Sequence, residues 1–360
     1  MTGAPAHAWG RRGAVRVMDR AVHYRRAGPP GAPVVILLHG SPESASAVHE
    51  IAALLLQTAC VIAPDTPGNG LSAPLDHADS DREDYARQLL AFMDVMGVSR
   101  AGLYGFHTGA GTAMAAALAA PQRVSALALD GLAVWTPDER AALLADYCVT
   151  YPPVWDGSHL ARIWARLEEQ LVFFPWHHAR LDARMALPPT PMETRLRRLR
   201  DWLTAHAHYP APYRAAFKAK GEDGPDRVSV PTLIGAMGRD PLSAHLDRLG
   251  KLAPGVKVER WGDDRAGALA SIAGHFSAHP GARADRPDPS DAALLAGLAA
   301  PQARPDWAPD DHGGFLLKLW RDVRNEVIAS AADQAALDAG LDPHALHARV
   351  TAAIQARTGL

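Results

Sequence analysis

Leu103-Tyr104-Gly105-Phe106-His107-Thr108-Gly109-Ala110-Gly111 is the stretch of sequence that decides the fold. It reads as a short apolar strand, a sharp turn at His107 and a helix of small residues that follows at once. Gly105 and Gly109 fit the frame G-x-S-x-G only when His107 is its central residue. Such a strand-turn-helix layout is a nucleophile elbow, in which the glycines are needed because larger side chains would collide in so tight a bend.

The composition is that of a globular protein. The chain has 360 residues, 48% of them hydrophobic, which is enough for one sizeable core with insertions or for two domains. The formal net charge of −2 argues against a nucleic-acid partner, because phosphate binding needs a concentrated surplus of Lys and Arg. The one basic run, residues 195–200, includes two leucines and predicts a solvated helix face.

Several signals favour the cytoplasm. The two cysteines, Cys60 and Cys148, match no metal or redox spacing and fit a reducing compartment. The first 12 residues lack the apolar centre of a signal peptide, and no run of about 18 apolar residues is present to span a bilayer. We therefore expect a cytoplasmic protein without a membrane partner.

Apolar runs alternate with helical patterns along the chain. Residues 34–38 and 60–63 are continuous runs of the kind expected in strands buried on both faces of a parallel sheet, and a helical segment over 47–56 separates them. A helix over 84–96 precedes the elbow. The alternation predicts an α/β fold with a mostly parallel central sheet flanked by helices. Further strands are expected at 15–17, 21–24, 124–129, 230–234 and 256–261.

Two loops at the ends of these strands carry a resemblance. Residues 39–44, HGSPES, look like the H-G-x-P-E-S loop, and residues 65–74 look like the D-x-P-G-x-G-x-S-x-x-P loop, of the α/β-hydrolase superfamily. With the elbow downstream in the family's order, the chain resembles the epoxide hydrolase and haloalkane dehalogenase-like branch. The resemblance implies an α/β-hydrolase core formed by 1–134 and 229–280, with a helical cap inserted at 135–228.

About 80 residues follow the expected end of the core. Residues 157–164 align at a constant offset with 313–320, each segment ending in a tryptophan, Trp164 and Trp320. This indicates a weak internal repeat, so that 281–360 would be a helical extension that packs with the cap. Two amphipathic helices that share a tryptophan by coincidence are the alternative.

The family's chain order of nucleophile, acid and histidine picks out His107, Asp240 and His275 as catalytic residues. Asp240 follows a buried strand, and His275 stands in the segment Gly274-His275-Phe276, which resembles the segment that bears the family's histidine. By the same resemblance Asp130 is a substitute acid. An Asp-Pro turn at Asp240 and an ordinary surface histidine at His275 are the structural alternatives.

The resemblance also implies an oxyanion hole. Its donors would be the backbone N–H groups of Ser41 and Thr108, the latter at the start of the helix that follows the elbow. Backbone donors do not depend on side-chain identity. The site is therefore expected to favour a carbonyl compound, or another substrate whose oxygen gains negative charge.

His107 at the nucleophile's position admits four interpretations. Its imidazole could attack an activated acyl carbon and form an acyl-imidazole that water cleaves. It could instead exchange protons with His275 without a covalent step, which suits a lyase or an enzyme that cleaves C–C bonds. The two histidines and Asp240 could hold a metal. Finally, the protein could bind a ligand without turnover.

The ester chemistry of epoxide hydrolases and dehalogenases does not transfer unchanged. Those enzymes place a carboxylate at the elbow and form an alkyl ester on it, which His107 cannot do. We expect a hydrolase of a small, mainly apolar carbonyl compound such as an ester or amide, with no cofactor and no metal. The lyase is the alternative, and the binding protein comes third.

The expected cap is rich in aromatic residues, which fits an apolar small molecule held between cap and core. Only part of these side chains is expected to line the site, since most belong to the cap's own core. The oligomeric state does not follow from the sequence, and a homodimer is one expected assembly. The candidate pocket residues are His39, Trp135, Tyr151, Trp155, Trp164, Phe173, Trp176, Tyr209 and Tyr213.

Overall fold

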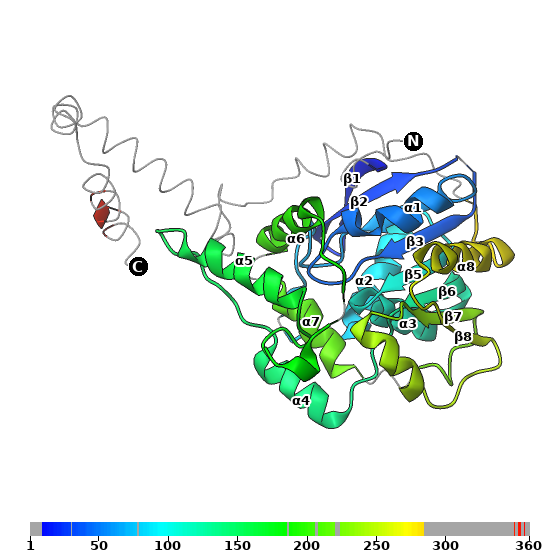
Figure 1. Ribbon diagram of the computed structural model, residues 1–360. Helices are drawn as coiled ribbons and strands as arrows, with labels where there is room; N and C mark the ends of the chain where they lie inside the picture. Colours follow the sequence, from blue (N-terminus) through cyan, green and yellow to red (C-terminus); the bar gives the residue numbers. More distant parts are fainter. Residues whose placement is uncertain are drawn as a thin grey trace. The chain divides into compact units, whose positions relative to one another are not determined.

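An eight-stranded sheet forms the core of the protein (Figure 1). The computed structural model describes residues 9–29, 31–77, 79–185, 187–205, 208–219 and 224–283, together with 349, 352, 353 and 356. The strand order is β1-β2-β4-β3-β5-β6-β7-β8. The strands are β1 (Arg11–Val17), β2 (Arg20–Ala27), β3 (Val34–Leu38), β4 (Cys60–Pro64), β5 (Ala101–Phe106), β6 (Val124–Asp130), β7 (Thr232–Ala236) and β8 (Val256–Arg260).

The sheet is mostly parallel. The hairpin β1–β2 pairs antiparallel with itself and with β4, and every later pair is parallel. In β3 all five residues are buried, as its unbroken apolar run predicts. The α/β class expected from the sequence, with a mostly parallel central sheet, is confirmed. The largest shift in a strand boundary is at β1, which begins at Arg11 rather than at residue 15.

Helices cover both faces of the sheet. On one face α2 (Arg82–Val95) packs against α3 (Thr108–Ala119), and on the other α1 (His49–Leu55) packs against α8 (Arg265–Ala278). Two separate clusters of buried apolar side chains lie under these pairs of helices. Because parallel strands end at the same edge, the loops after β3, β5 and β7 converge there.

Four α-helices lie between β6 and β7 in the described part of the chain, where the cap was expected. They are α4 (Pro137–Asp146), α5 (Ser158–Gln170), α6 (Met192–Ala205) and α7 (Pro210–Lys218). The described residues up to 149 and those from 166 to 283 form one compact unit, whereas 150–165 belong to a second. The predicted extension 281–360, with its repeat at 313–320, lies outside the described residues except for 281–283 and four positions near the end.

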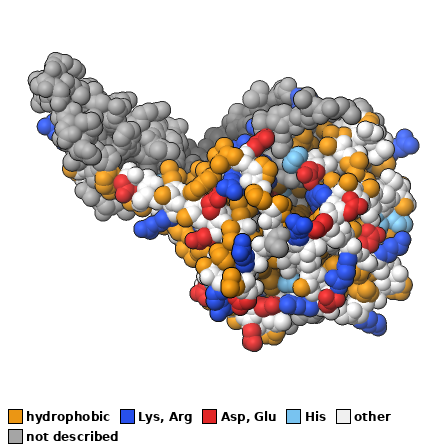
Figure 2. Space-filling model, viewed as in Figure 1, with side chains coloured by type: hydrophobic (Ala, Val, Ile, Leu, Met, Phe, Trp, Pro, Cys, Tyr) orange, Lys and Arg blue, Asp and Glu red, His pale blue; other side chains and the backbone are white. Residues whose placement is uncertain are grey.

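The surface carries mixed charge. Acidic and basic side chains are intermingled on the face drawn in Figure 2. None of the helices in the described ranges is long and apolar enough to cross a membrane.

Candidate functional site

His107 occupies the apex of a strained turn between β5 and α3. Its backbone has φ +49° and ψ −109°, a conformation that costs a non-glycine residue on the order of 1–3 kcal/mol. The backbone N–H of His107 donates to the carbonyl of Asp130, the last residue of the neighbouring strand β6, at 2.9 Å. The sheet and the helix thus hold the imidazole in place at the edge where the strands end.

Asp240 pairs directly with the His107 ring. The His107 Nε2 atom lies 2.7 Å from Asp240 Oδ2, and Asp240 Oδ1 accepts the Leu242 backbone N–H at 2.8 Å. An ionised carboxylate only accepts hydrogen bonds, so Nε2 carries the proton and the neutral ring keeps its lone pair on Nδ1. Asp240 is the only hydrogen-bonding partner of this ring in the described part of the chain, and 31% of the His107 side chain is exposed.

The pair shifts both ionisation equilibria. Burial disfavours a charged imidazole, but the Asp240 carboxylate outweighs that effect and raises the pKa of His107. Burial likewise opposes ionisation of Asp240, yet the facing His107 ring and the Leu242 N–H lower its pKa. The dyad is therefore built to stabilise an imidazolium next to a carboxylate.

The two expected oxyanion donors are adjacent, but one is occupied. The Ser41 backbone N–H donates to the Thr108 side-chain oxygen at 2.8 Å, and the two hydroxyl oxygens lie 3.1 Å apart. Thr108 is the first residue of α3, where a backbone N–H has no partner within the helix. The Thr108 hydroxyl must turn away before Ser41 can donate to a ligand.

His275 does not join this site, and its expected role as the base is corrected. The residue lies in the last turn of α8 instead of in a loop. Its ring faces the backbone of Pro231 and Leu127, and its pKa is lowered, mainly by burial. Pro231 immediately precedes β7, so His275 sits at the edge where the parallel strands begin, opposite to the edge that holds His107.

Asp130 does not contact the His107 ring through its side chain. Its Oδ2 accepts the Tyr104 hydroxyl at 2.9 Å and an Arg265 N–H at 3.2 Å. Burial raises its pKa, although Arg265 and Tyr104 partly counteract this. These contacts give Asp130 a structural place beneath the elbow, whereas the pairing with His107 belongs to Asp240.

A cavity of about 320 Å³ opens beside the dyad. His107, Thr108 and Ser41 line one part of it, together with Asp240. An aromatic cluster from the inserted region lines another part, with ring centroids 5.2 Å apart for Tyr147–Tyr213 and 5.6 Å for Tyr213–Phe217. A site of this size and apolar character suits a small molecule. The aromatic lining residues are Tyr85, Phe106, Trp135, Tyr147, Phe174, Trp202, Tyr213 and Phe217.

Of the pocket residues proposed from the sequence, Trp135 and Tyr213 line this cavity. His39 is fully buried beneath it, where its Nε2 accepts the Thr66 N–H at 3.0 Å and burial lowers its pKa. Three other aromatic candidates lie in the inserted region but do not line the cavity, namely Phe173, Trp176 and Tyr209. Tyr151, Trp155 and Trp164 belong to the separate unit 150–165, and their role stays a prediction.

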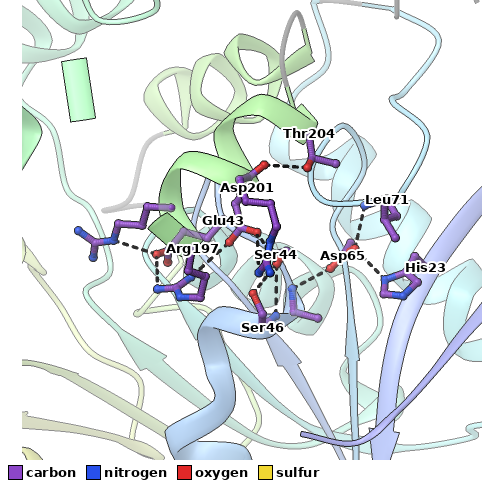
Figure 3. A network of polar contacts seen from close by, with 12 residues as sticks. His23, Glu43, Ser44, Ser46, Asp65, Leu71, Arg197, Asp201 and Thr204 are labelled. Atoms are coloured by element: carbon purple, nitrogen blue, oxygen red, sulfur yellow. Dashed lines mark hydrogen bonds and ion pairs between the residues drawn. The ribbon is translucent and has the colours of Figure 1, made fainter. Parts of the chain in front are cut away.

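Asp65 ties together the two loops whose sequences carry the resemblance. Its Oδ1 accepts the Ala45 N–H at 2.7 Å, while Oδ2 accepts the Leu71 N–H at 2.9 Å and lies 2.8 Å from the His23 Nδ1 (Figure 3). Ala45 follows the first loop and Leu71 lies in the second. One buried carboxylate thus fixes the loop that holds Ser41.

The basic run at 195–200 is more than a solvated face. Figure 3 shows Arg197 of α6 reaching Glu43 in the loop after β3 and Asp201 on its own helix, at 3.0 and 3.3 Å. Arg198 and Glu43 both line the cavity. Sequence reasoning missed them, since Glu43 and Arg197 are 154 positions apart and no local pattern links them.

The structure does not bring together the three residues that the metal hypothesis requires as ligands. It required His107, His275 and Asp240 together, but His275 lies at the opposite edge of the sheet. Within the described ranges no three His, Cys, Asp or Glu side chains are grouped so as to hold a metal ion.

Comparisons with known proteins agree with this architecture. A model of the alpha/beta hydrolase fold family matches residues 33–263, and the chain belongs to that family. Epoxide hydrolase A of Mycobacterium tuberculosis is 40% identical over 104 residues, 28% of this chain and 32% of that protein. The 2-hydroxy-6-oxononadienedioate/2-hydroxy-6-oxononatrienedioate hydrolase 2 of Pseudomonas putida is 35% identical over 118 residues, 32% of this chain and 41% of that one.

Among solved structures, epoxide hydrolase A from Mycobacterium thermoresistibile superposes with a TM-score of 0.58 at 21% identity, covering 74% of this chain and 98% of the other. That likeness shows the fold. The matched part of this chain spans about two fifths or less of the curated relatives described above.

Proposed function

We propose that this protein is a cofactor-independent hydrolase of small, mainly apolar acyl compounds, in which His107 is the nucleophile and Asp240 its acid partner. The observation that carries the proposal is the 2.7 Å contact between His107 Nε2 and Asp240 at the apex of the elbow, beside an apolar cavity. The related proteins are named as hydrolases, which supports hydrolysis as the class of reaction.

The Nδ1 lone pair of the neutral ring attacks the acyl carbon, and the carbonyl oxygen gains the electron pair of the C=O π bond. The Thr108 N–H stabilises that oxygen, as does the Ser41 N–H once the Thr108 hydroxyl has turned. When the carbonyl re-forms, the bond to the leaving group breaks and the leaving group takes a proton from solvent. Water then cleaves the acyl-imidazole, which releases the acid and restores the neutral ring.

Asp240 contributes by stabilising the positive charge that the ring acquires when Nδ1 forms its bond. It also fixes the tautomer that exposes the Nδ1 lone pair. The same ring could take a proton from a water that attacks the carbonyl, and the first experiment below separates that route from nucleophilic attack. The lyase alternative is less well supported, since the His275 ring faces the backbone of Pro231 and Leu127, at the other edge of the sheet from His107.

Intact-mass analysis tests the covalent step. Quenching the protein in acid during turnover of p-nitrophenyl hexanoate is expected to reveal a hexanoyl adduct that maps to His107. The adduct should be absent from His107→Ala. Turnover that depends on His107 but shows no adduct under rapid quenching would replace the nucleophile by a general base. The absence of any turnover of activated acyl esters would contradict the proposed function.

The rate should depend on pH through His107. Only the neutral ring has a free lone pair on Nδ1, so kcat/KM is expected to rise with pH through a midpoint above the ordinary histidine value of about 6.5 and then to level off. Because Asp240 is what raises the pKa of His107, Asp240→Asn should move the midpoint to lower pH and reduce the plateau. A midpoint that does not move in Asp240→Asn would contradict the assignment of this dyad.

A further inference from the structure

One part of the cavity wall is basic, and a buried carboxylate organises it. Glu43 lines the cavity, and its Oε1 accepts hydrogen bonds from Arg197 Nη2 at 3.0 Å and from Arg198 Nε at 3.2 Å. Burial opposes the charge on Glu43, but the two guanidinium groups outweigh it and lower its pKa to about 2. Glu43 is therefore fully ionised and shared by two cations.

Arg198 keeps most of its hydrogen-bonding capacity for a ligand. Its Nε is held by Glu43, whereas Nη1 and Nη2 have no hydrogen-bond partner among the residues that the structure describes. The side chain is 36% exposed and lines the cavity. A guanidinium anchored through Nε still presents a planar pair of N–H donors, which matches the two oxygens of a carboxylate.

Positive charges outnumber negative charges around Arg198. Arg197 is shared between Glu43 and Asp201, and Arg200 adds a further cation 3.7 Å from Asp201. Three guanidinium groups, those of Arg197, Arg198 and Arg200, thus face two carboxylates. This excess of positive charge favours an anion beside Arg198.

A second cation lies behind the aromatic wall. Arg166 is 1% exposed, and its guanidinium lies 4.1 Å from the ring centroid of Trp176 and 5.1 Å from that of Tyr147. Its Nη1 donates to Gln170 at 2.8 Å, whereas Nε and Nη2 have no hydrogen-bond partner in the described chain. Tyr147 and Gln170 line the cavity, so this buried positive charge adds to the positive potential inside it.

We propose that the ligand of this cavity carries a carboxylate, which the two Nη groups of Arg198 bind while Glu43 positions the guanidinium. The substrate class is then an acyl compound with an acidic group at one end, an apolar middle part against the aromatic wall and the scissile carbonyl at His107. The carboxylate site stands on its own contacts. Only the placement of the scissile carbonyl rests on the proposed function.

Equilibrium binding tests the carboxylate site without any turnover. Titration calorimetry at constant ionic strength would compare hexanoate with hexanamide, a neutral compound of the same length and shape. Wild-type protein is expected to bind hexanoate about tenfold or more tightly, as charge-assisted hydrogen bonds predict. Arg198→Gln should lower hexanoate affinity far more than hexanamide affinity and so remove the preference, and Arg198→Lys should retain part of it.

Arg200→Gln is the matched control. It removes one positive charge from the same helix, but Arg200 does not line the cavity and its side chain is 51% exposed. It should weaken hexanoate binding only slightly, through the loss of one distant positive charge, and should keep a clear preference for hexanoate over hexanamide. Equal affinity for the two compounds in the wild type, or a preference that survives Arg198→Gln, would overturn the carboxylate site. If hexanoate is preferred but no acyl ester is turned over, the proposed function fails and the carboxylate site stands.

Discussion

His107→Ala is expected to lower kcat/KM for p-nitrophenyl hexanoate by about 10³-fold or more, because removing a nucleophile deletes the covalent route altogether. His275→Gln is expected to keep the wild-type value. The two histidines lie at opposite edges of the same sheet, with His107 after β5 and His275 against Pro231 ahead of β7. Steady-state assays of both variants, with thermal unfolding as a check on folding, measure the difference.

The variant His107→Ser also tests whether His107 is the one histidine that acts in this site. Serine at the elbow would restore the family's frame, but a serine needs a neighbouring base to become nucleophilic. In the described chain no histidine other than His107 lines the cavity, so we expect His107→Ser to be as inactive as His107→Ala. Esterase activity in His107→Ser above that of the wild type would mean that a second histidine does reach the site. A loss of the wild-type activity in His275→Gln would mean the same.

The loop position predicted for His275 was wrong because two sequence patterns indicated different structures at this residue. The triplet Gly274-His275-Phe276 matched a family segment, but Ala268, Ile272 and Phe276 recur every four residues and are all buried. That spacing, with Asp264 capping the first turn through the Gly267 N–H, predicts a helix. A spacing of buried residues sustained over a whole helix is stronger physical evidence than a match of three residues, so this pattern favours a helix at His275 over a loop.

Other parts of the architecture were predictable because they are local. The continuous apolar runs of β3 and β4 predicted strands buried on both faces of a parallel sheet, and the glycine spacing predicted the elbow. The contact between Glu43 and Arg198 was not predictable, since residues 155 positions apart meet only through the tertiary fold. The same holds for Tyr147, which sequence reasoning passed over and which the structure places in the cavity wall.

Gly109→Ala is expected to destabilise the elbow strongly. A Cβ at this position would lie 2.6 Å from the Leu38 carbonyl oxygen and 2.7 Å from that of His39. Both are backbone atoms at the end of β3, so neither can rotate away, and α3 would have to move off the sheet. Overpacking of this kind costs roughly 1–3 kcal/mol or more.

Gly111→Ala provides the matched comparison for Gly109→Ala, since the two glycines share the first turn of α3. Apart from its chain neighbours and its own helix backbone, a Cβ at Gly111 would meet no atom of the described residues within 4 Å, and alanine is favoured over glycine in a helix by up to about 1 kcal/mol. Thermal unfolding should therefore give a midpoint several degrees below the wild type for Gly109→Ala and one at or above it for Gly111→Ala. If both variants lost stability equally, the cost would come from the helix and not from the approach of α3 to β3. Because that approach sets the distance from Ser41 to Thr108, Gly109→Ala should also weaken hydrolysis in the fraction that folds, by moving the oxyanion donors apart.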